Sequence, residues 1–209
     1  MLLEFKTKNY KSFVEEASFS MVAAPKQKGL DYSLMKTKIK GKEIKGLSSS
    51  VIYGPNAAGK TNIIGAMDVL RSIVLRGNIR NSEEKSSPNP AASALELIPN
   101  NNESEAKPVC FEIEFYEEDG EEHKFKIHYE LQIDLGTFLE EEYQRKILAE
   151  VLEVNGERVF ERREGLKVEN LKVIKDYLSD ITEQNAESIN EIAKNSLNQE
   201  ELFLTNGFK

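Results

Sequence analysis

The chain of 209 residues has little cysteine and histidine, and it has no long hydrophobic run. Its single cysteine, Cys110, excludes a disulfide within the chain and is expected to pack as a small apolar side chain in a strand. The histidines His123 and His128 stand at odd and even positions of one expected strand, so they should not share a metal ion. No segment has membrane-spanning length and the start lacks a signal-peptide core, so we expect a cytoplasmic protein.

Acidic residues are scarce only near the start of the chain. Residues 1–46 carry a net charge of +5, whereas the remainder carries −13. A DNA-binding surface is therefore expected on the N-terminal part rather than on the rest of the molecule. The alternative is that these lysines only face water, and the sequence leaves both readings open.

The clearest motif is the stretch SSSVIYGPNAAGKTN at 48–62. It holds Gly54, four further residues and then Gly59, Lys60 and Thr61, which is the spacing of a phosphate-binding loop. Glycine allows the backbone to approach an anion closely and to point several N–H groups at it, and the start of a helix adds its dipole. We therefore predict a nucleotide site in which Lys60 contacts the β- and γ-phosphates and Thr61 binds Mg²⁺.

The surroundings of this loop match the expected strand before it and helix after it. The β-branched and aromatic run at 51–53 predicts a strand over 49–53. An apolar spacing of three and four residues predicts a helix over 60–76. The apolar face of this helix is expected to hold Ile63, Ile64, Met67, Leu70, Ile73 and Val74. The alternative, an incidental glycine-rich turn, does not account for this context.

The remaining chain reads as strands, one insertion and a helical end. Strands are expected within 2–23, a loop with at most one short strand over 24–46, two strands around the turn EEDGEE after 109, and a hairpin over 147–163 that turns at Asn155 and Gly156. Helical spacing returns over 168–198. The segment 80–108 is rich in Ser, Asn, Glu and Pro, so we expect a surface insertion that is partly disordered.

Elements that nucleotide hydrolysis needs are missing from the sequence. A strand that ends in aspartate and glutamate should hold Mg²⁺ and orient the attacking water. The nearest segments are YELQID at 129–134, which alternates like a half-exposed strand, and VIKD at 173–176, which follows helical spacing. The guanine-reading pattern Asn-Lys-x-Asp is absent as well. We therefore expect this chain alone to bind a nucleotide and to hydrolyse it negligibly.

The pair NYKSF at 9–13 and GPNAAGKTN at 54–62 resembles the N-terminus of ABC-type ATPases of the SMC, RecF and OLD-nuclease kind. More narrowly, it resembles the bacterial RecF-like AAA/ATP-binding proteins of anti-phage and abortive-infection systems. The segment 139–165 is similar to their β-hairpin lobe. The resemblance implies an α/β P-loop NTPase fold, namely the N-terminal lobe of an ABC ATPase head, with an antiparallel β-hairpin lobe and C-terminal helices.

The same resemblance implies two parts and a set of site residues. Residues 1–165 would form the N-terminal lobe of an ATP-binding head, including the insertion 80–108, and 166–209 a helical segment that continues into a missing C-terminal part. ATP and Mg²⁺ are the implied cofactors. The implied nucleotide-binding residues are Gly54, Pro55, Asn56, Ala57, Ala58, Gly59, Lys60, Thr61 and Asn62, with Asn9, Lys11 and Ser12 nearby, and Thr61 as the metal ligand. Ala57 stands where many members carry glycine.

In such proteins two heads sandwich ATP between the loop of one and an LSxGx segment of the other. LSSS at 47–50 and LSDI at 178–181 lack the needed glycine. The resemblance therefore implies one part of an ATPase that pairs as a homodimer when complete. Arg80 is a candidate contact of the γ-phosphate and Gln144 a candidate sensor of Mg²⁺; the alternatives are a helix-end arginine and a solvated glutamine.

The implied function is ATP·Mg²⁺ binding by the N-terminal part of an ABC-type ATPase in DNA maintenance or phage defence. Its hydrolysis would require the Walker B and signature segments of the missing part, and its partners would be a nuclease or toxin and DNA. Two alternatives remain open. One is a nucleotide-gated assembly module that binds ATP without hydrolysing it. The other is a P-loop kinase, although the chain shows no arginine-rich lid.

Overall fold

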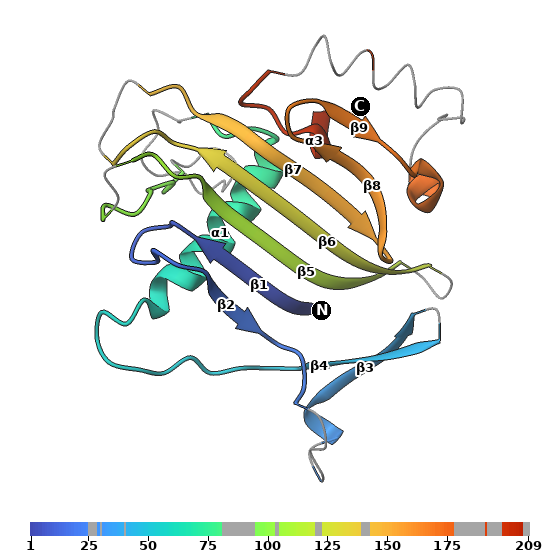
Figure 1. The fold of residues 1–209 in the computed structure, drawn as a ribbon. Helices are drawn as coiled ribbons and strands as arrows, with labels where there is room; N and C mark the ends of the chain where they lie inside the picture. Colours follow the sequence, from blue (N-terminus) through green and yellow to red (C-terminus); the bar gives the residue numbers. More distant parts are fainter. Residues whose placement is uncertain are drawn as a thin grey trace.

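The fold is built on one antiparallel sheet (Figure 1). The computed structural model describes residues 1–24, 29, 31–39, 41–80, 95–102, 105–119, 123–138, 143–177, 191 and 198–206. The sheet has seven strands in the order β2-β1-β5-β6-β7-β8-β9. These are β1 (Leu2–Lys8), β2 (Ala17–Ser20), β5 (Val109–Asp119), β6 (His123–Asp134), β7 (Lys146–Val154), β8 (Glu157–Arg162) and β9 (Leu166–Val168).

The strands form where the sequence alternates apolar and polar residues. In β1, Leu3 and Phe5 are buried with Thr7, and the residues between them face outward. The predicted hairpin over 147–163 is confirmed as β7 and β8. Its turn residues Asn155 and Gly156 have φ angles of 55° and 79°, the positive values that a two-residue hairpin turn with matching twist requires.

The helix α1 (Lys60–Arg76) crosses one face of the sheet and covers its core (Figure 1). It ends at Gly77, whose φ of 74° and N–H bond to the carbonyl of Ile73 form a left-handed cap. The predicted bounds are confirmed. One predicted face residue differs, because Ile64 is 58% exposed while Ile63, Leu70 and Ile73 are buried. No helix in the described part of the chain is long and apolar enough to cross a membrane.

A separate hairpin occupies the region where a loop was expected. It consists of β3 (Leu34–Ile39) and β4 (Lys42–Leu47), preceded by the short helix η1 (Asp31–Ser33). Backbone hydrogen bonds from Ala23 to Lys45 and from Leu47 to Met21 attach β4 to the chain that leaves β2. The expectation of at most one short strand over 24–46 is therefore wrong, because two strands form there.

The strand predicted over 49–53 does not form. Residues 48–54 run along the lower side of the molecule in Figure 1 without any assigned strand. Val51 and Tyr53 are 82% and 90% exposed, and only Ile52 packs against the core. The residue types favour a strand, but a strand forms only when another one pairs with it, and no described segment does so.

The predicted insertion 80–108 is only partly a surface segment. Residues 81–94 lie outside the described part of the chain. In contrast, Leu95 and Leu97 are 7% and 5% exposed and belong to the main core, and the following residues pair with 9–11. Composition averaged over the segment hid these two leucines, because serine, asparagine and proline dominate around them.

The structure differs from the prediction at the start of the segment 168–198, for which helices were expected. Strand β9 extends to Val168, and η2 (Leu171–Tyr177) is a 3-10 helix rather than an α-helix. Residues 178–190 and 192–197 lie outside the described residues. The chain returns to the core at 198–206, where the short helix α3 (Phe203–Asn206) packs Phe203 edge-on against Phe160.

Candidate functional site

The loop before α1 has a solvent-exposed backbone that an anion can reach. Residues 53–58 are exposed, and α1 begins after Gly59, whose φ is 82°. No side chain caps the first turn of the helix. The N–H groups of Asn62 and Ile63 donate to the carbonyl of Gly59, so an anion would bind the N–H groups that precede them. Ala57 has a φ of 64°, a left-handed conformation that costs a non-glycine residue about 1–2 kcal/mol. The alanine in this position is therefore accommodated at a modest energetic cost.

Lys60 closes this loop from the helix side. Its ammonium group donates to the carbonyl of Gly54 at 2.9 Å and to that of Pro55 at 2.6 Å. The positive charge therefore lies over the residues that begin the loop, next to the free end of the helix. A phosphate bound here would replace neutral carbonyl acceptors with a charged one, which makes stronger hydrogen bonds. Thr61 follows with an exposed side chain, in the position that the prediction gives to the Mg²⁺ ligand.

The turn at 10–13 packs directly on this loop. Tyr10 and Phe13 exchange two backbone hydrogen bonds of 3.1 and 2.9 Å, which leaves Lys11 and Ser12 at the tip. The hydroxyl oxygen of Ser12 accepts a 2.7 Å bond from the amide of Asn62 in the first turn of α1. A Cβ atom on Gly59 would lie 2.9 Å from the ring of Phe13. Glycine is thus needed at 59 both for its positive φ and for the contact with this turn.

Asn9 and Lys11 have left-handed backbones, with φ angles of 53° and 47°. Asn9 is 4% exposed and donates its side-chain amide to the carbonyl of Lys107, so it lies behind the turn rather than on the open side of the loop. The ammonium of Lys11 pairs with Glu96 and lies 5.5 Å from the centre of the Tyr10 ring. Burial lowers the pKa of Lys11, but its hydrogen bond to Glu96 and its neighbours' charges outweigh this, and the pKa is raised.

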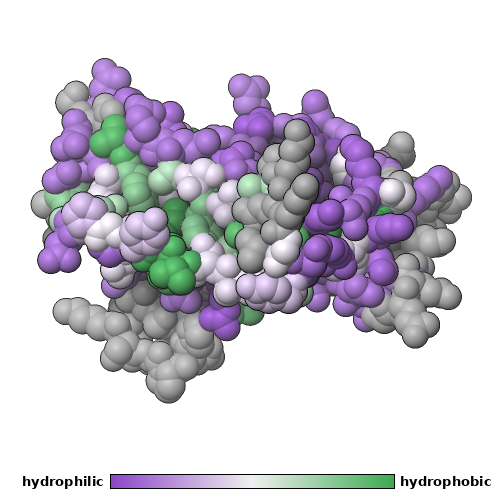
Figure 2. Space-filling view, turned by 90° about the horizontal axis from the view of Figure 1, so that it is seen from below, coloured by the Kyte–Doolittle hydropathy of each residue, from purple (hydrophilic) through white to green (hydrophobic). Residues whose placement is uncertain are grey.

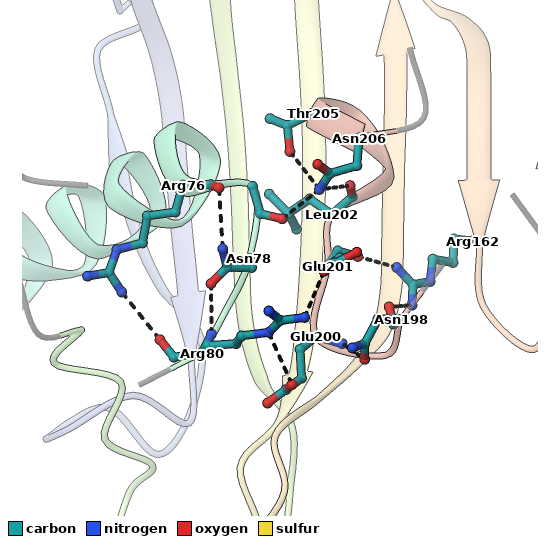
Figure 3. Close-up of polar contacts among 11 residues, drawn as sticks. Arg76, Asn78, Arg80, Arg162, Asn198, Glu200, Glu201, Leu202, Thr205 and Asn206 are labelled. Atoms are coloured by element: carbon teal, nitrogen blue, oxygen red, sulfur yellow. Dashed lines mark hydrogen bonds and ion pairs between the residues drawn. The ribbon is translucent and has the colours of Figure 1, made fainter. Parts of the chain in front are cut away.

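Arg80 and Gln144 lie at the other end of α1. A helix of 17 residues is about 25 Å long, and Arg80 comes four positions after its last residue, Arg76. Figure 3 shows Arg80 pointing to Glu200 and Glu201, at 3.4 and 2.7 Å. Arg145, next to the exposed Gln144, bonds the carbonyl of Ile79 at this same end. The interpretation of Arg80 as a γ-phosphate contact in this head is therefore wrong, and Gln144 lies away from the loop.

A buried carboxylate fixes the returning segment 198–206 at this far end. Glu150 of β7 is fully buried and accepts hydrogen bonds from the Tyr129 hydroxyl at 3.0 Å and from the N–H groups of Phe203 and Leu204 at 2.7 and 2.9 Å. Burial raises the pKa of Glu150, against the lowering effect of these bonds. Arg162 donates to the carbonyls of Glu201 and Asn198 (Figure 3). No pattern in the sequence indicates this cluster.

Figure 2 shows the molecule from below, the side along which residues 48–59 run in Figure 1. Hydrophobic atoms are exposed there among mostly hydrophilic ones. Among the exposed large apolar residues are Val51 and Tyr53 before the loop and Ile64 on α1. The loop at 54–61 is therefore flanked in the chain by exposed apolar residues that no described part of the chain covers.

Sequence reasoning missed the residues that hold the turn at 10–13 from behind. Chief among them is Asn100, which is 5% exposed and bonds the backbone of Asn9 and Lys11. A signal was present, since Leu95, Glu96 and Leu97 alternate apolar and polar residues as a strand does. Among the predicted residues, the structure brings Ser12, Gly59, Lys60 and Asn62 together.

A family model described as "AAA domain, putative AbiEii toxin, Type IV TA system" matches residues 49–201. The match covers more than half of the chain, and it starts shortly before the loop and ends in the segment that bonds Arg80. No curated protein and no solved structure gives a significant match. The turn at 9–13 lies outside the matched range, so its contact with the loop is known from the structure alone.

Proposed function

This chain belongs to the AAA-domain family described above, and on that premise we propose that it is the ATP·Mg²⁺-binding N-terminal part of an ABC-type ATPase in phage defence or DNA maintenance. The family is one of nucleotide-binding, ATPase-like proteins with a P-loop type of α/β fold. The observation that carries the proposal is the loop at 54–61. It joins an uncapped helix start, an exposed backbone and the ammonium of Lys60 within one short segment.

Hydrolysis in this proposal needs elements from outside residues 1–209. The support comes from Val51 and Tyr53, which are exposed just before the loop, while Ile52 anchors the same run to the core. A β-branched and aromatic run of this kind is suited to pair with a further strand. We propose that such a strand brings the aspartate and glutamate that orient water, and that the LSxGx segment comes from a second head.

The isolated 209-residue chain should therefore release phosphate from ATP negligibly. Enzymes typically turn over at about 1 per second or faster, and this chain should stay far below that rate. A phosphate-release assay on the purified chain measures it. A rate near 1 per second would contradict the proposal. If the longest product of the gene also binds ATP without hydrolysing it, the function is that of a nucleotide-gated assembly module instead.

Thr61→Ala should lose the part of ATP affinity that depends on Mg²⁺, because it removes the hydroxyl that binds the metal. We expect a loss of about tenfold, the size of one hydrogen bond to a charged group. Thr61→Ser keeps a hydroxyl and should retain the affinity of the parent. Titration calorimetry with Mg²⁺ and with a chelator separates the metal-dependent part. Equal metal dependence in the alanine and serine variants would remove Thr61 from the metal site.

We propose pairing of two heads through ATP, a nuclease or toxin as effector, and DNA as a further ligand. The register of β3 and β4 places Lys36, Lys38 and Lys45 on one face of the hairpin, in the basic part of the chain. Lys36 and Lys45 are paired with Asp31 and Glu43, so this face carries less free charge than the sequence suggested.

A further inference from the structure

The segment 95–102 holds both left-handed residues of the turn next to the loop. The backbone N–H of Asn100 donates to the backbone carbonyl of Asn9 at 3.2 Å and to its side-chain oxygen at 3.3 Å. The side-chain amide of Asn100 donates to the carbonyl of Lys11 at 2.6 Å. The N–H of Lys11 in turn donates to the carbonyl of Ile98 at 3.0 Å. One buried asparagine therefore contacts both positions at which the backbone has a positive φ.

These contacts continue into the start of α1. Lys11 is followed by Ser12, whose hydroxyl accepts from Asn62, and by Phe13, which lies against Gly59. Both Gly59 and Asn62 flank Lys60 and Thr61. The position of the helix start is thus set on one side by its own loop and on the other by a turn that Asn100 holds.

We propose that Asn100 is a positioning residue of the nucleotide site. Its amide keeps Lys11 in the left-handed conformation, and this conformation places Ser12 and Phe13 against the first turn of α1. The proposal rests on the proposed function, in which the loop binds ATP. Asn100 itself is 5% exposed and bonded on both sides, since its side-chain oxygen also accepts from the N–H of Asn102 at 2.9 Å.

The side chain of Glu96 also contacts this turn, and it is less suited to this role. Its side chain is 70% exposed, so its ion pair with Lys11 exchanges readily with water and contributes little. The bond from the Asn100 side-chain amide to the Lys11 carbonyl is partly buried, and its loss leaves that carbonyl without this donor. Non-glycine residues keep a positive φ only where their surroundings enforce it.

The experiment compares ATP·Mg²⁺ affinity by titration calorimetry in the parent and in Asn100→Ala. Asn100→Ser is the second variant, because its hydroxyl can still accept from Asn102 but is too short to reach Lys11. Asn102→Ala is the matched control, since this asparagine lies two positions along and has an exposed side chain. Thermal denaturation without nucleotide establishes that each variant is folded at the temperature of the titration.

We expect N100A and N100S to bind ATP about tenfold more weakly than the parent, and N102A to bind like the parent. The decisive step repeats N100A in a Lys11→Gly background, because glycine adopts a positive φ without help. There the loss caused by N100A should fall below about threefold. An equal loss in both backgrounds overturns the proposal, as does unchanged affinity in N100A. If the parent shows no Lys60-dependent binding, the proposed function fails as well.

Hydrogen–deuterium exchange without ATP gives a readout that does not depend on the nucleotide. In N100A, or in N100S if the alanine variant does not fold, amide exchange should become faster at 10–13 and at 59–63. It should stay unchanged at 198–206, which packs at the far end of α1. Faster exchange that is confined to 95–102 would mean that Asn100 stabilises only its own segment, and would overturn the proposal.

Discussion

Lys60→Ala should weaken ATP binding by about 30-fold or more. A hydrogen bond to a charged group contributes about 1.5–3 kcal/mol, and Lys60 is placed to supply such bonds to phosphate. In the structure its ammonium already bridges the helix start and the carbonyls of Gly54 and Pro55. These hydrogen bonds to neutral carbonyls are exposed, so their loss should change the free energy of unfolding by less than about 1 kcal/mol. Titration calorimetry measures the affinity and thermal denaturation the stability.

Two companion variants sharpen this test. Lys167→Ala removes an exposed lysine from β9, near the opposite edge of the sheet, and should leave ATP affinity unchanged. Lys60→Arg keeps the positive charge but replaces the compact ammonium group with a planar guanidinium group. We therefore expect an ATP affinity between those of K60A and the parent. Equal affinity in K60A and the parent would show that the loop does not bind the nucleotide as proposed.

Glu150→Ala should destabilise the fold by about 3–5 kcal/mol and lower the melting temperature by about 10 °C. The variant leaves the Tyr129 hydroxyl and the N–H groups of Phe203 and Leu204 without their acceptor in a buried place. It also removes the carboxylate that lies 4.0 Å from the guanidinium of the buried Arg162. Denaturant unfolding measures the loss. Glu153→Ala is the control on the same strand, since its ion pair with Arg158 is partly exposed and should matter by under about 1 kcal/mol.

Glu150→Gln removes a pH dependence of stability whose sign follows from the burial of Glu150. Burial raises the pKa of Glu150 above its ordinary 4.5, so the folded protein holds this proton more tightly than the unfolded chain does. The contribution of the carboxyl to stability is therefore full below pH 4.5 and falls as pH rises through the raised pKa. Glutamine does not titrate, so the stability gap between parent and variant should shrink over that window. A gap that widens with pH would mean that the folded pKa is lowered instead.

The parts of the fold that the sequence predicted are those with local signals. The helix α1 follows from its apolar spacing, and the turn at Asn155 and Gly156 follows from residues that accept a positive φ. The spacing at 54–61 is recognisable because a phosphate-binding loop requires a fixed spacing of residues. In each case the prediction depends only on residues that are close together in the sequence.

The parts that were not predicted depend on contacts between distant residues. Residues 49–53 have strand propensity, but pairing cannot be read from propensity alone. Glu150 looks like any polar residue of a strand until the segment 202–204 places two N–H groups against it. The position of Asn100 behind the loop depends on a contact with Asn9 across 91 residues.

The strand order has a consequence for how the protein reaches this structure. Strands β5 to β9 pair with their neighbours in the chain, so they can form by closing short loops. β1 must instead find β5, and Lys8 meets Cys110 only after a loop of about a hundred residues has closed. We therefore expect the meander β5–β9 to form early and β1 to join it late. The turn at 10–13 follows β1 directly, so the nucleotide site would be among the last features to appear during folding, and ATP would bind only chains that have completed it.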